Sequence, residues 1–478
     1  MENHTDVANK HIELPPAASR LMTGLRDTDY QFVTAVADLV DNSISAGAGR
    51  VAISIQHEGL NSWVSIEDDG EGMDAKTLSE AMRYGSIKDA DYDGEALGKF
   101  GLGLKTASLS QCRKMTVCTR SSAERRIFTV MRWDVDKVKD KWLAELLTPD
   151  DLPAHLMAGL QKHTGTVVLW ENLDRVIGGY ANPDGKRAKD GLLALADDLA
   201  FHLGMVFHRF LDGAVKRRRK LAITVNGNPV SPWDPFAREH KKTLHLKPES
   251  FELITPDGKR GEVTYTPFVL PTRDHLTDTE ADYLGGPDKW MKQQGFYVYR
   301  NNRLIRYGGW LNMRAGDEHT KLARAAIDFP SKLDELFKIN IAKERVLLPP
   351  ELRDQLMPHV KLLWDRADKI YRKEGSEKTA SGTSVASSAG HRAVPATSSG
   401  PILKGNTDVW AGHMEQGVSE RESDFAGSQL AIADSVAPEK IRAVLERAAH
   451  ATVGDGVLAA LITEVKKQSS EVARALGY

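Results

Sequence analysis

The most regular pattern of apolar and polar positions in the chain lies between residues 32 and 45. Apolar side chains recur there at helical spacing, and a polar set falls at i, i+3, i+4 and i+7: Asp38, Asp41, Asn42 and Ser45. The pattern predicts a helix with one packed face and one polar face. An Asn oxygen and a carboxylate on adjacent turns can bind a hard cation and orient a water, although a solvated helix face would give the same pattern.

Two short runs with strand character follow this helix, at 51–56 and 63–67. They place Asp68 at the end of a strand, with Gly70 and Gly72 in the turn after it. An ionised Asp accepts hydrogen bonds, so it can hold an exocyclic amine such as that of adenine. Glycines let the backbone approach a base closely. An ordinary Asp-Gly turn is the alternative.

A glycine-rich segment places Gly98, Gly101 and Gly103 just before a helical stretch that begins near Leu104. Backbone amides at such a helix start bind phosphate, and Lys105 adds positive charge. The spacing differs from that of a Walker A loop and from that of the dinucleotide fingerprint. For this segment alone, a connection between two helices is the alternative.

The three motifs DLVDNSISAGA, EDDGEGMD and GKFGLGLKTAS occur in this order and resemble the N, G1 and G2 boxes of the GHKL ATPases. That superfamily includes gyrase B subunits, MutL proteins, histidine kinases, heat-shock 90 chaperones and MORC ATPases. A later segment, HTGTVVLWENLD, resembles the strand whose Gly165-Thr166 pair helps Asp68 hold adenine. The resemblance implies that Asn42 coordinates magnesium. It also implies a nucleotide pocket and lid that include Asp68, Gly70, Gly72, Met73, Gly98, Gly101, Leu102, Gly103, Leu104, Lys105 and Thr166.

The position of the general base departs from the family pattern. In the hydrolysing members a Glu normally precedes the Asn by four residues, and here that residue is Asp38. Its side chain is one methylene shorter, and a general base must come within about 2.6–3.2 Å of its water. We therefore expect an ATP hydrolase with slow turnover, in which Asp38 is the base and Asp41 is an auxiliary polar residue.

Three longer segments, YQFVTAVADLVDNSISAGA, GKFGLGLKTAS and GFYVYRNNRLIRYGGW, look closest to MORC-type ATPases and secondarily to MutL. This resemblance implies an α+β fold, in which a Bergerat-type ATP-binding α/β sandwich precedes a transducer-like α/β domain. The transducer of such enzymes sends one Lys back to the terminal phosphate, and Lys343 in INIAKERV matches that position. A surface Lys beside other charges is the alternative.

Turns and strand-like runs support a second domain, which we expect to begin near Lys220. The first hairpin turn in it is Asn226-Gly227, and a second pair of strand-like runs flanks Asn301-Asn302. A helical segment follows from 351 to 371.

Composition changes abruptly after residue 373, where Ser, Ala, Gly and Thr dominate up to about residue 400, as in a linker. Helical periodicity returns at 437–450 and 457–476. We expect five segments, namely an N-terminal arm (1–25), an ATP-binding domain (26–213), a transducer-like domain (214–373), a disordered linker (374–402) and a helical C-terminal module (403–478).

Composition and charge add modest constraints. With 41% hydrophobic and 27% charged residues in 478, the chain is an ordinary globular protein, and its net charge of −2 gives no global case for nucleic acid. One compact basic run could contact DNA locally, although it could equally be a solvated hinge: Lys216, Arg217, Arg218, Arg219 and Lys220.

The cysteine content and the hydropathy of the chain indicate the cellular compartment in which it is expected. The two cysteines, Cys112 and Cys118, have no partners in the sequence that would complete a zinc site, and such a content is typical of the reducing cytoplasm. The apolar stretch at 192–206 is interrupted by charged residues, so no membrane span is predicted.

The sequence as a whole predicts an ATP-gated clamp. Magnesium and ATP would order a lid between Tyr84 and Gly103, Lys343 would dock, and two copies would associate as a homodimer until hydrolysis releases them. By resemblance to MORC and MutL, the client would be DNA, in genome maintenance or defence. The alternative is a chaperone-like or scaffold ATPase that remodels a protein partner held by the C-terminal helices.

Overall fold

The computed structural model of this chain describes residues 16–27, 30–85, 97, 103–122, 127–287, 289–339 and 346–381. All of them belong to one compact unit, Met1–Lys404. The predicted C-terminal module at 403–478 lies outside the described residues, as does the linker beyond 381.

An eight-stranded sheet organises the first half of the described chain, in the order β5-β4-β3-β6-β2-β1-β7-β8. Its neighbouring strands are antiparallel except for the parallel pair β1 and β7. The predicted strands at 51–56 and 63–67 are confirmed as β1 and β2. The strands are β1 Arg50–Gln56, β2 Trp63–Asp68, β3 Lys114–Arg120, β4 Phe128–Asp134, β5 Glu145–Leu147, β6 Gly165–Glu171, β7 Ala222–Val225 and β8 Asn228–Pro229.

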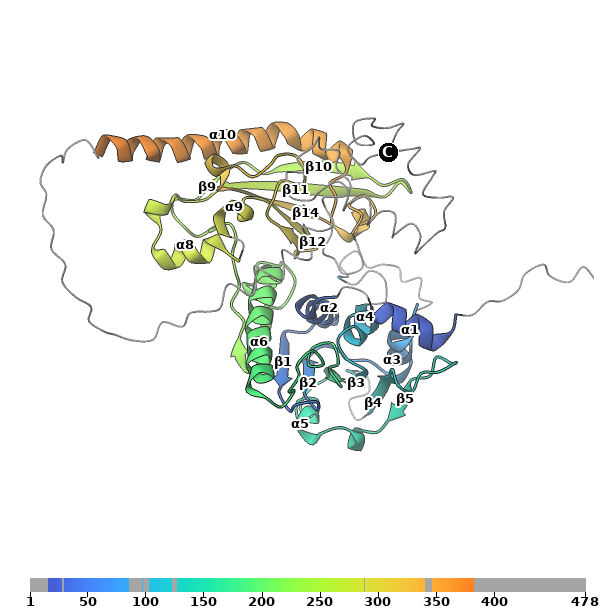
Figure 1. The fold of residues 1–478 in the computed structure, drawn as a ribbon. Coiled ribbons are helices and arrows are strands. Elements are labelled where there is room, and N and C mark those ends of the chain that lie inside the picture. The colour runs from blue at the N-terminus through green and yellow to red at the C-terminus, as the bar shows by residue number, and fades with distance from the viewer. Residues whose placement is uncertain are drawn as a thin grey trace, which may run out of the picture. The chain divides into compact units, whose positions relative to one another are not determined.

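Helices cover one face of this sheet (Figure 1). Alternate strand residues point to opposite faces, so Val117 and Val168 pack under the helical layer while Cys118 and Val167 pack on the other side with α5. The helices are α1 Ala18–Arg26, α2 Phe32–Ser45, α3 Ala75–Met82, α4 Gly103–Leu109, α5 Ala154–Met157, α6 Lys186–Val206 and α7 His208–Leu211, with a short 3-10 turn η1 at Pro149–Asp151.

A six-stranded sheet organises the second half, in the order β10-β11-β14-β12-β13, with β9 paired to β11. The strands are β9 Leu244–His245, β10 Glu249–Ile254, β11 Arg260–Val269, β12 Gly295–Arg300, β13 Arg303–Tyr307 and β14 Ala323–Phe329. The helices are α8 Asp278–Gly285, α9 Lys289–Gln293 and α10 Pro350–Ser381, and the 3-10 turns are η2 Arg273–His275, η3 Glu318–Thr320 and η4 Ser331–Leu333.

Helix α10 lies along one face of the second sheet, as Figure 1 shows. Its apolar side chains recur at helical spacing and are buried there: Leu352, Leu356, Val360, Leu363 and Ala367. The helix predicted from 351 to 371 is thus confirmed, but it continues to Ser381 and so enters the segment predicted as linker.

The hairpin at Asn226-Gly227 forms as predicted, with positive φ at both residues, but it belongs to the first sheet. Strand β7 pairs in parallel with β1, so the expectation that the second domain starts near Lys220 was wrong. The local sequence specifies a turn, whereas the sheet that the strand joins is set by the crossover through α6. The described chain up to β8 is called the first body below, and the described chain from β9 onward is called the second body.

The N-terminal arm predicted over 1–25 also ends earlier than expected. Helix α1 starts at Ala18 and buries Met22 in the core of the first body. Arg26 is buried too, donating to the Leu109 carbonyl at 2.6 Å and pairing with Asp174.

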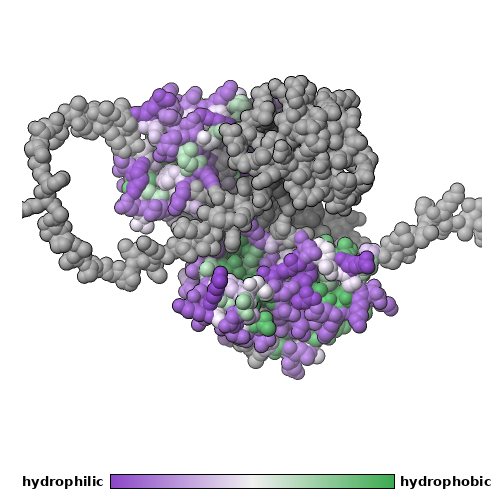
Figure 2. All heavy atoms as spheres, viewed as in Figure 1, coloured by the Kyte–Doolittle hydropathy of each residue, from purple (hydrophilic) through white to green (hydrophobic). Residues whose placement is uncertain are grey.

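Hydrophilic residues cover most of the described surface that Figure 2 shows. Of the helices in the described part of the chain, none combines the length and the apolar character needed to cross a membrane.

Candidate nucleotide-binding site

Asp68 is a buried carboxylate at the end of strand β2, and its side chain reaches Ser43 of α2. The Ser43 hydroxyl donates to one oxygen of Asp68 at 2.9 Å, and the Gly70 N–H donates to the other at 3.0 Å. Burial raises the pKa of Asp68 to about 6, although hydrogen bonds from Gly70, Ser43 and Thr166 oppose that rise. Among the described residues Asp68 makes no ion pair, so its acceptor oxygens are oriented while its charge has no cationic partner.

Two glycines let three chain segments meet beside Asp68. Gly72 has φ +67°, and a Cβ there would lie 2.1 Å from the Arg120 carbonyl oxygen. Gly165 has φ +143°, and a Cβ there would lie 1.9 Å from the Asp68 carbonyl oxygen. Only glycine fits either position, so the turn after β2 is held against the ends of β3 and β6.

The Thr119 hydroxyl ties the same segments together. It accepts the Met73 N–H at 2.9 Å, donates to the Gly165 carbonyl at 3.0 Å and lies 3.1 Å from the Thr166 hydroxyl. The structure therefore brings the predicted residues Met73 and Thr166 close to Asp68, as the sequence motifs implied.

The polar face of α2 is half buried, because two of its four residues are buried and two are exposed. Asp38 and Asp41 are buried, whereas Asn42 is exposed. A solvated helix face, the alternative that the sequence left open, is therefore wrong for the two carboxylates. The exposed Asn42 amide is the one of the three that a ligand can reach from solvent.

Asp38 is held at both carboxylate oxygens. The Tyr30 hydroxyl donates to Oδ2 at 2.6 Å, and Nη2 of Arg303 lies 3.6 Å from Oδ1. The start of α4 is also close, because a Cβ on Gly103 would lie 3.8 Å from Oδ2. The first and third sequence motifs thus meet at Asp38.

Asp41 anchors an arginine of the second sheet. Nε of Arg303 lies 2.8 Å from Oδ2 of Asp41 and donates to Oδ1 at 2.9 Å. The Asp41 side chain is fully buried, and its role as an auxiliary polar residue stays a prediction.

Part of the predicted phosphate end lies outside the described residues, namely Gly98, Gly101, Leu102 and Lys343. One residue of the glycine-rich region is described. Leu97 is buried, its N–H approaches the Ser45 hydroxyl at 3.4 Å, and its carbonyl accepts from Arg300 at 2.8 Å.

Lys105 is buried on α4, where Nζ donates to the Ala81 carbonyl at the end of α3 at 2.8 Å. Burial lowers the pKa of Lys105 to about 8. Leu104 packs partly buried against the core. A phosphate contact from Lys105 stays a prediction.

The residues present fit a magnesium ion that arrives with a nucleotide. In the described part of the chain, no group of three His, Cys, Asp or Glu side chains could hold a metal by itself. Mg²⁺ commonly keeps several waters and binds through one or two protein oxygens together with substrate phosphates. The exposed Asn42 oxygen suits that role.

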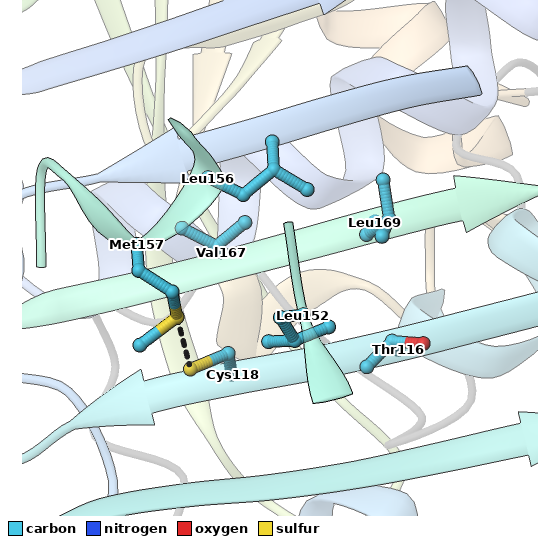
Figure 3. Close-up of a pocket in the computed structure, with 7 residues that line it drawn as sticks. All are labelled: Thr116, Cys118, Leu152, Leu156, Met157, Val167 and Leu169. Carbon is cyan, nitrogen blue, oxygen red and sulfur yellow. Dashed lines mark hydrogen bonds between the residues drawn. The ribbon is translucent and has the colours of Figure 1, made fainter. Parts of the chain in front are cut away.

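A separate apolar pocket lies on the other face of the first sheet (Figure 3). The Cys118 thiol there lies 3.5 Å from the Met157 sulfur, and aliphatic side chains make up most of the lining. Its lining shares no residue with the cluster around Asp68, so it does not serve as the candidate nucleotide site.

The basic run lies between α7 and β7 and lines a cavity of about 340 Å³ with Ile44 and Phe210. Two of its arginines bind protein groups, since Arg218 donates to the Ile44 carbonyl and Arg219 pairs with Asp69. The side chains of its other members are exposed: Lys216, Arg217 and Lys220.

Sequence reasoning missed four polar residues around the site: Tyr30, Ser43, Thr119 and Arg303. Ser43 directly follows the predicted magnesium ligand, and its hydroxyl is the kind of donor that a buried carboxylate needs. Arg303 gave no local signal, because it lies 262 positions from Asp41 in the chain.

Comparison with known proteins places this site in context. Residues 30–166 match the family described as histidine kinase-, DNA gyrase B- and HSP90-like ATPases. The chain is 35% identical over 98 residues to the DNA mismatch repair protein MutL of Haemophilus influenzae strain PittEE. It is 30% identical over 123 residues to MutL of Mannheimia succiniciproducens and 32% identical over 115 residues to MutL of Dictyoglomus thermophilum.

These matches cover a limited part of each protein. The match to the Haemophilus protein spans 20% of this chain and 15% of that relative. The other two span 25% and 23% of this chain, and 19% and 20% of those relatives. The predicted similarity to this superfamily is confirmed for residues 30–166, and the closer relation to MORC-type ATPases stays a prediction.

Proposed function

Because residues 30–166 belong to the histidine kinase-, DNA gyrase B- and HSP90-like ATPases, we propose that this chain binds Mg-ATP between α2, the end of β2 and β6, and hydrolyses it. The observation that carries the proposal is Asp68, a buried carboxylate with oriented oxygens and no cationic partner among the described residues. Such a group is suited to accept a hydrogen bond from the adenine amine.

The remaining roles follow the positions of the side chains. Asn42 supplies an oxygen to magnesium from the exposed part of α2. Asp38 orients and deprotonates the attacking water, and the ion, when bound with ATP, neutralises charge on the phosphates. The short Asp side chain makes turnover slow.

Single-turnover ATP hydrolysis by Asp38 variants tests the assignment of the base. Asp38→Ala is expected to lower the rate by roughly 10²–10⁴-fold while ATP affinity stays within a few fold, because the carboxylate acts on water and not on the nucleotide. Asp136→Ala, which removes an exposed carboxylate paired with Arg113, is the matched control. Hydrolysis by Asp38→Ala at the wild-type rate would exclude Asp38 as the base.

We also propose that ATP drives homodimerisation, with Lys343 docking on the terminal phosphate. Light scattering with magnesium and a non-hydrolysable ATP analogue tests this association. Wild type is expected to shift from monomer to dimer, and Asn42→Ala is expected not to respond. Nucleotide binding without a change in size would exclude ATP-driven association.

We propose DNA as the client, because the similar relatives are named as DNA mismatch repair proteins and because the basic run offers three exposed cations besides Arg219, which pairs with Asp69. The variant Lys216→Gln/Arg217→Gln/Lys220→Gln leaves Arg218 and Arg219 in their interactions with the protein. It should weaken DNA binding and make the affinity less sensitive to salt. The slope of the logarithm of affinity against the logarithm of salt concentration should fall by about 0.9 for each DNA phosphate that the variant no longer neutralises.

An equally exposed basic pair provides the control for DNA binding. Lys241→Gln/Lys242→Gln removes two exposed charges elsewhere and should leave the salt slope unchanged. Equal weakening in both variants would point to general attraction by surface charge. No DNA binding by wild type, with or without ATP, would exclude a DNA client.

A further inference from the structure

Two arginines at the tip of the β12–β13 hairpin reach from the second sheet to the candidate nucleotide site. Arg300 ends β12 and Arg303 begins β13. Asn301 and Asn302 between them both have positive φ, which is the backbone geometry of a tight two-residue turn. The turn therefore fixes the spacing of the two guanidinium groups.

Arg300 binds the second body and the glycine-rich region together. Its Nε and Nη2 form a fork onto Asp334 at 2.7 and 2.9 Å, while Nη1 donates to the Leu97 carbonyl at 2.8 Å. The Leu97 N–H in turn approaches Ser45 of α2. Leu97 is thus held between α2 and the hairpin.

Arg303 makes the corresponding contact with α2. It pairs closely with Asp41 and lies 3.6 Å from Asp38, and all three side chains are at most 3% exposed. Charges this well shielded from water interact strongly, and a planar guanidinium imposes a direction on its partners that an ammonium does not.

We propose that Arg303 is a positioning residue for ATP hydrolysis and that the β12–β13 hairpin makes turnover depend on contact between the second sheet and α2. The proposal rests on the function proposed above, in which Asp38 activates water. The Tyr30 hydroxyl donates to one oxygen of Asp38, and the Arg303 guanidinium lies beside the other oxygen. The short carboxylate therefore keeps one orientation.

The hairpin should affect the rate of hydrolysis and not nucleotide affinity. Asp68 is oriented by Ser43, Gly70 and Thr166, and neither Arg300 nor Arg303 takes part in those hydrogen bonds. Removing Arg303 would misplace Asp38 without changing the adenine end of the site. Misplacement of a reacting group by about 1 Å can lower a rate by as much as 10²-fold.

The first variant for the test is Arg303→Lys, which keeps the charge but removes the planar guanidinium that faces Asp41 with Nε and Asp38 with Nη2. The second is Arg303→Met/Asp41→Asn, which removes one buried cation together with its closest anion and so leaves no new unpaired charge at Asp41. Arg324→Lys is the matched control. Arg324 of β14 is also a buried arginine of the second sheet, but it donates to the Pro235 and Leu284 carbonyls, and its hydrogen bonds involve neither α2 nor the Asn301-Asn302 turn.

The measurements are kcat, KM and the dissociation constant of a fluorescent ATP analogue, each in the wild-type and the Asp38→Ala background. We expect both Arg303 variants to lower kcat by roughly tenfold or more while the dissociation constant stays within about threefold. In the Asp38→Ala background they should lower kcat no further, because the group that they position is already absent. Arg324→Lys should leave kcat within about twofold of wild type.

Three results would overturn the proposal alone: kcat within about twofold of wild type in both Arg303 variants, an equal decrease in the Asp38→Ala background, or an equal decrease in Arg324→Lys. Failure of the proposed function has a different signature. Wild type would then not hydrolyse ATP, or Asp38→Ala would hydrolyse it at the wild-type rate, and the role of Arg303 would fall with it.

Discussion

The buried carboxylates of this site are compensated in two different ways. Asp68 is oriented by hydrogen bonds alone, and burial raises its pKa to about 6. Asp38 and Asp41 lie on the neighbouring helix and share Arg303, which comes from the second sheet. One end of the site therefore holds an anion without a protein cation among the described residues, while the other end has its charges paired across two sheets.

In this account, Asp68 serves ligand binding, whereas Asp38 and Asp41 couple α2 to the second sheet. A carboxylate without a cationic partner offers its acceptor strength to a ligand, at the cost of stability when it is ionised. Carboxylates paired with an arginine offer little to a ligand but connect the helix that carries them to the body that supplies the arginine. Substitutions at the two ends should consequently have opposite effects on stability.

The largest effect is expected from Arg303→Met, which leaves Asp38 and Asp41 buried without this cation. It should lower the free energy of unfolding by about 3–5 kcal/mol, measured by denaturant titration. Adding Asp41→Asn should restore a large part of that stability. If the single and double variants are equally unstable, the charge pairing is not what stabilises this interface.

Asp68→Asn should act in the opposite direction. The pKa of Asp68 is higher in the folded chain than the ordinary value of about 3.9, so the native state binds more protons between about pH 4 and pH 6 and stability falls as pH rises through that window. At pH 7 the variant should be more stable than wild type by about 2–3 kcal/mol. The two proteins should be equally stable near pH 4, and a constant difference across pH would contradict this account.

The same ionisation should appear in ligand binding. Because the ionised carboxylate of Asp68 is a stronger hydrogen-bond acceptor than the protonated acid, and because its pKa is about 6, ATP affinity should fall below pH 6, by up to about tenfold per pH unit. Titration of the ATP phosphates contributes to the same curve, so the ratio of wild-type to Asp68→Asn affinity is the quantity to measure. A ratio that does not change with pH would show that Asp68 does not titrate in this range.

The smallest effect is expected from Tyr30→Phe, which removes one of the groups that hold Asp38. The hydrogen bond is 2.6 Å long, and its removal should cost about 1 kcal/mol of stability. A decrease in kcat that exceeds the decrease in the fraction of folded protein would indicate that Tyr30 contributes to the orientation of Asp38. No change in either property would show that Tyr30 does not hold Asp38 in place.

The sequence predicted the surroundings of Asp68 better than the contacts between the two sheets. The strand end at Asp68 and the turn with Gly70 and Gly72 were predicted from residues close together in the chain, because a strand end and a glycine turn are local features. The burial of Asp41 was not predicted, for the opposite reason. Helical spacing places it on a polar face, but only the folded chain shows that Arg303 buries that face.

The fold shows the same division. Strands β1 and β2, helix α4 and helix α10 were expected from local pattern, whereas the partner of β7 was not. A short strand next to a tight turn fits either sheet equally well by its own sequence. The crossover through α6 decides the pairing, and this information is not local.

Calorimetric titration of wild type and Asp68→Asn with Mg-ATP and Mg-GTP tests the central claim most directly, because guanine presents a carbonyl where adenine presents an amine. We predict that wild type binds ATP more tightly than GTP, and that Asp68→Asn weakens ATP binding by roughly tenfold or more while changing GTP binding little. Equal affinity of wild type for the two nucleotides, or unchanged ATP binding by Asp68→Asn, would contradict the assignment of this site.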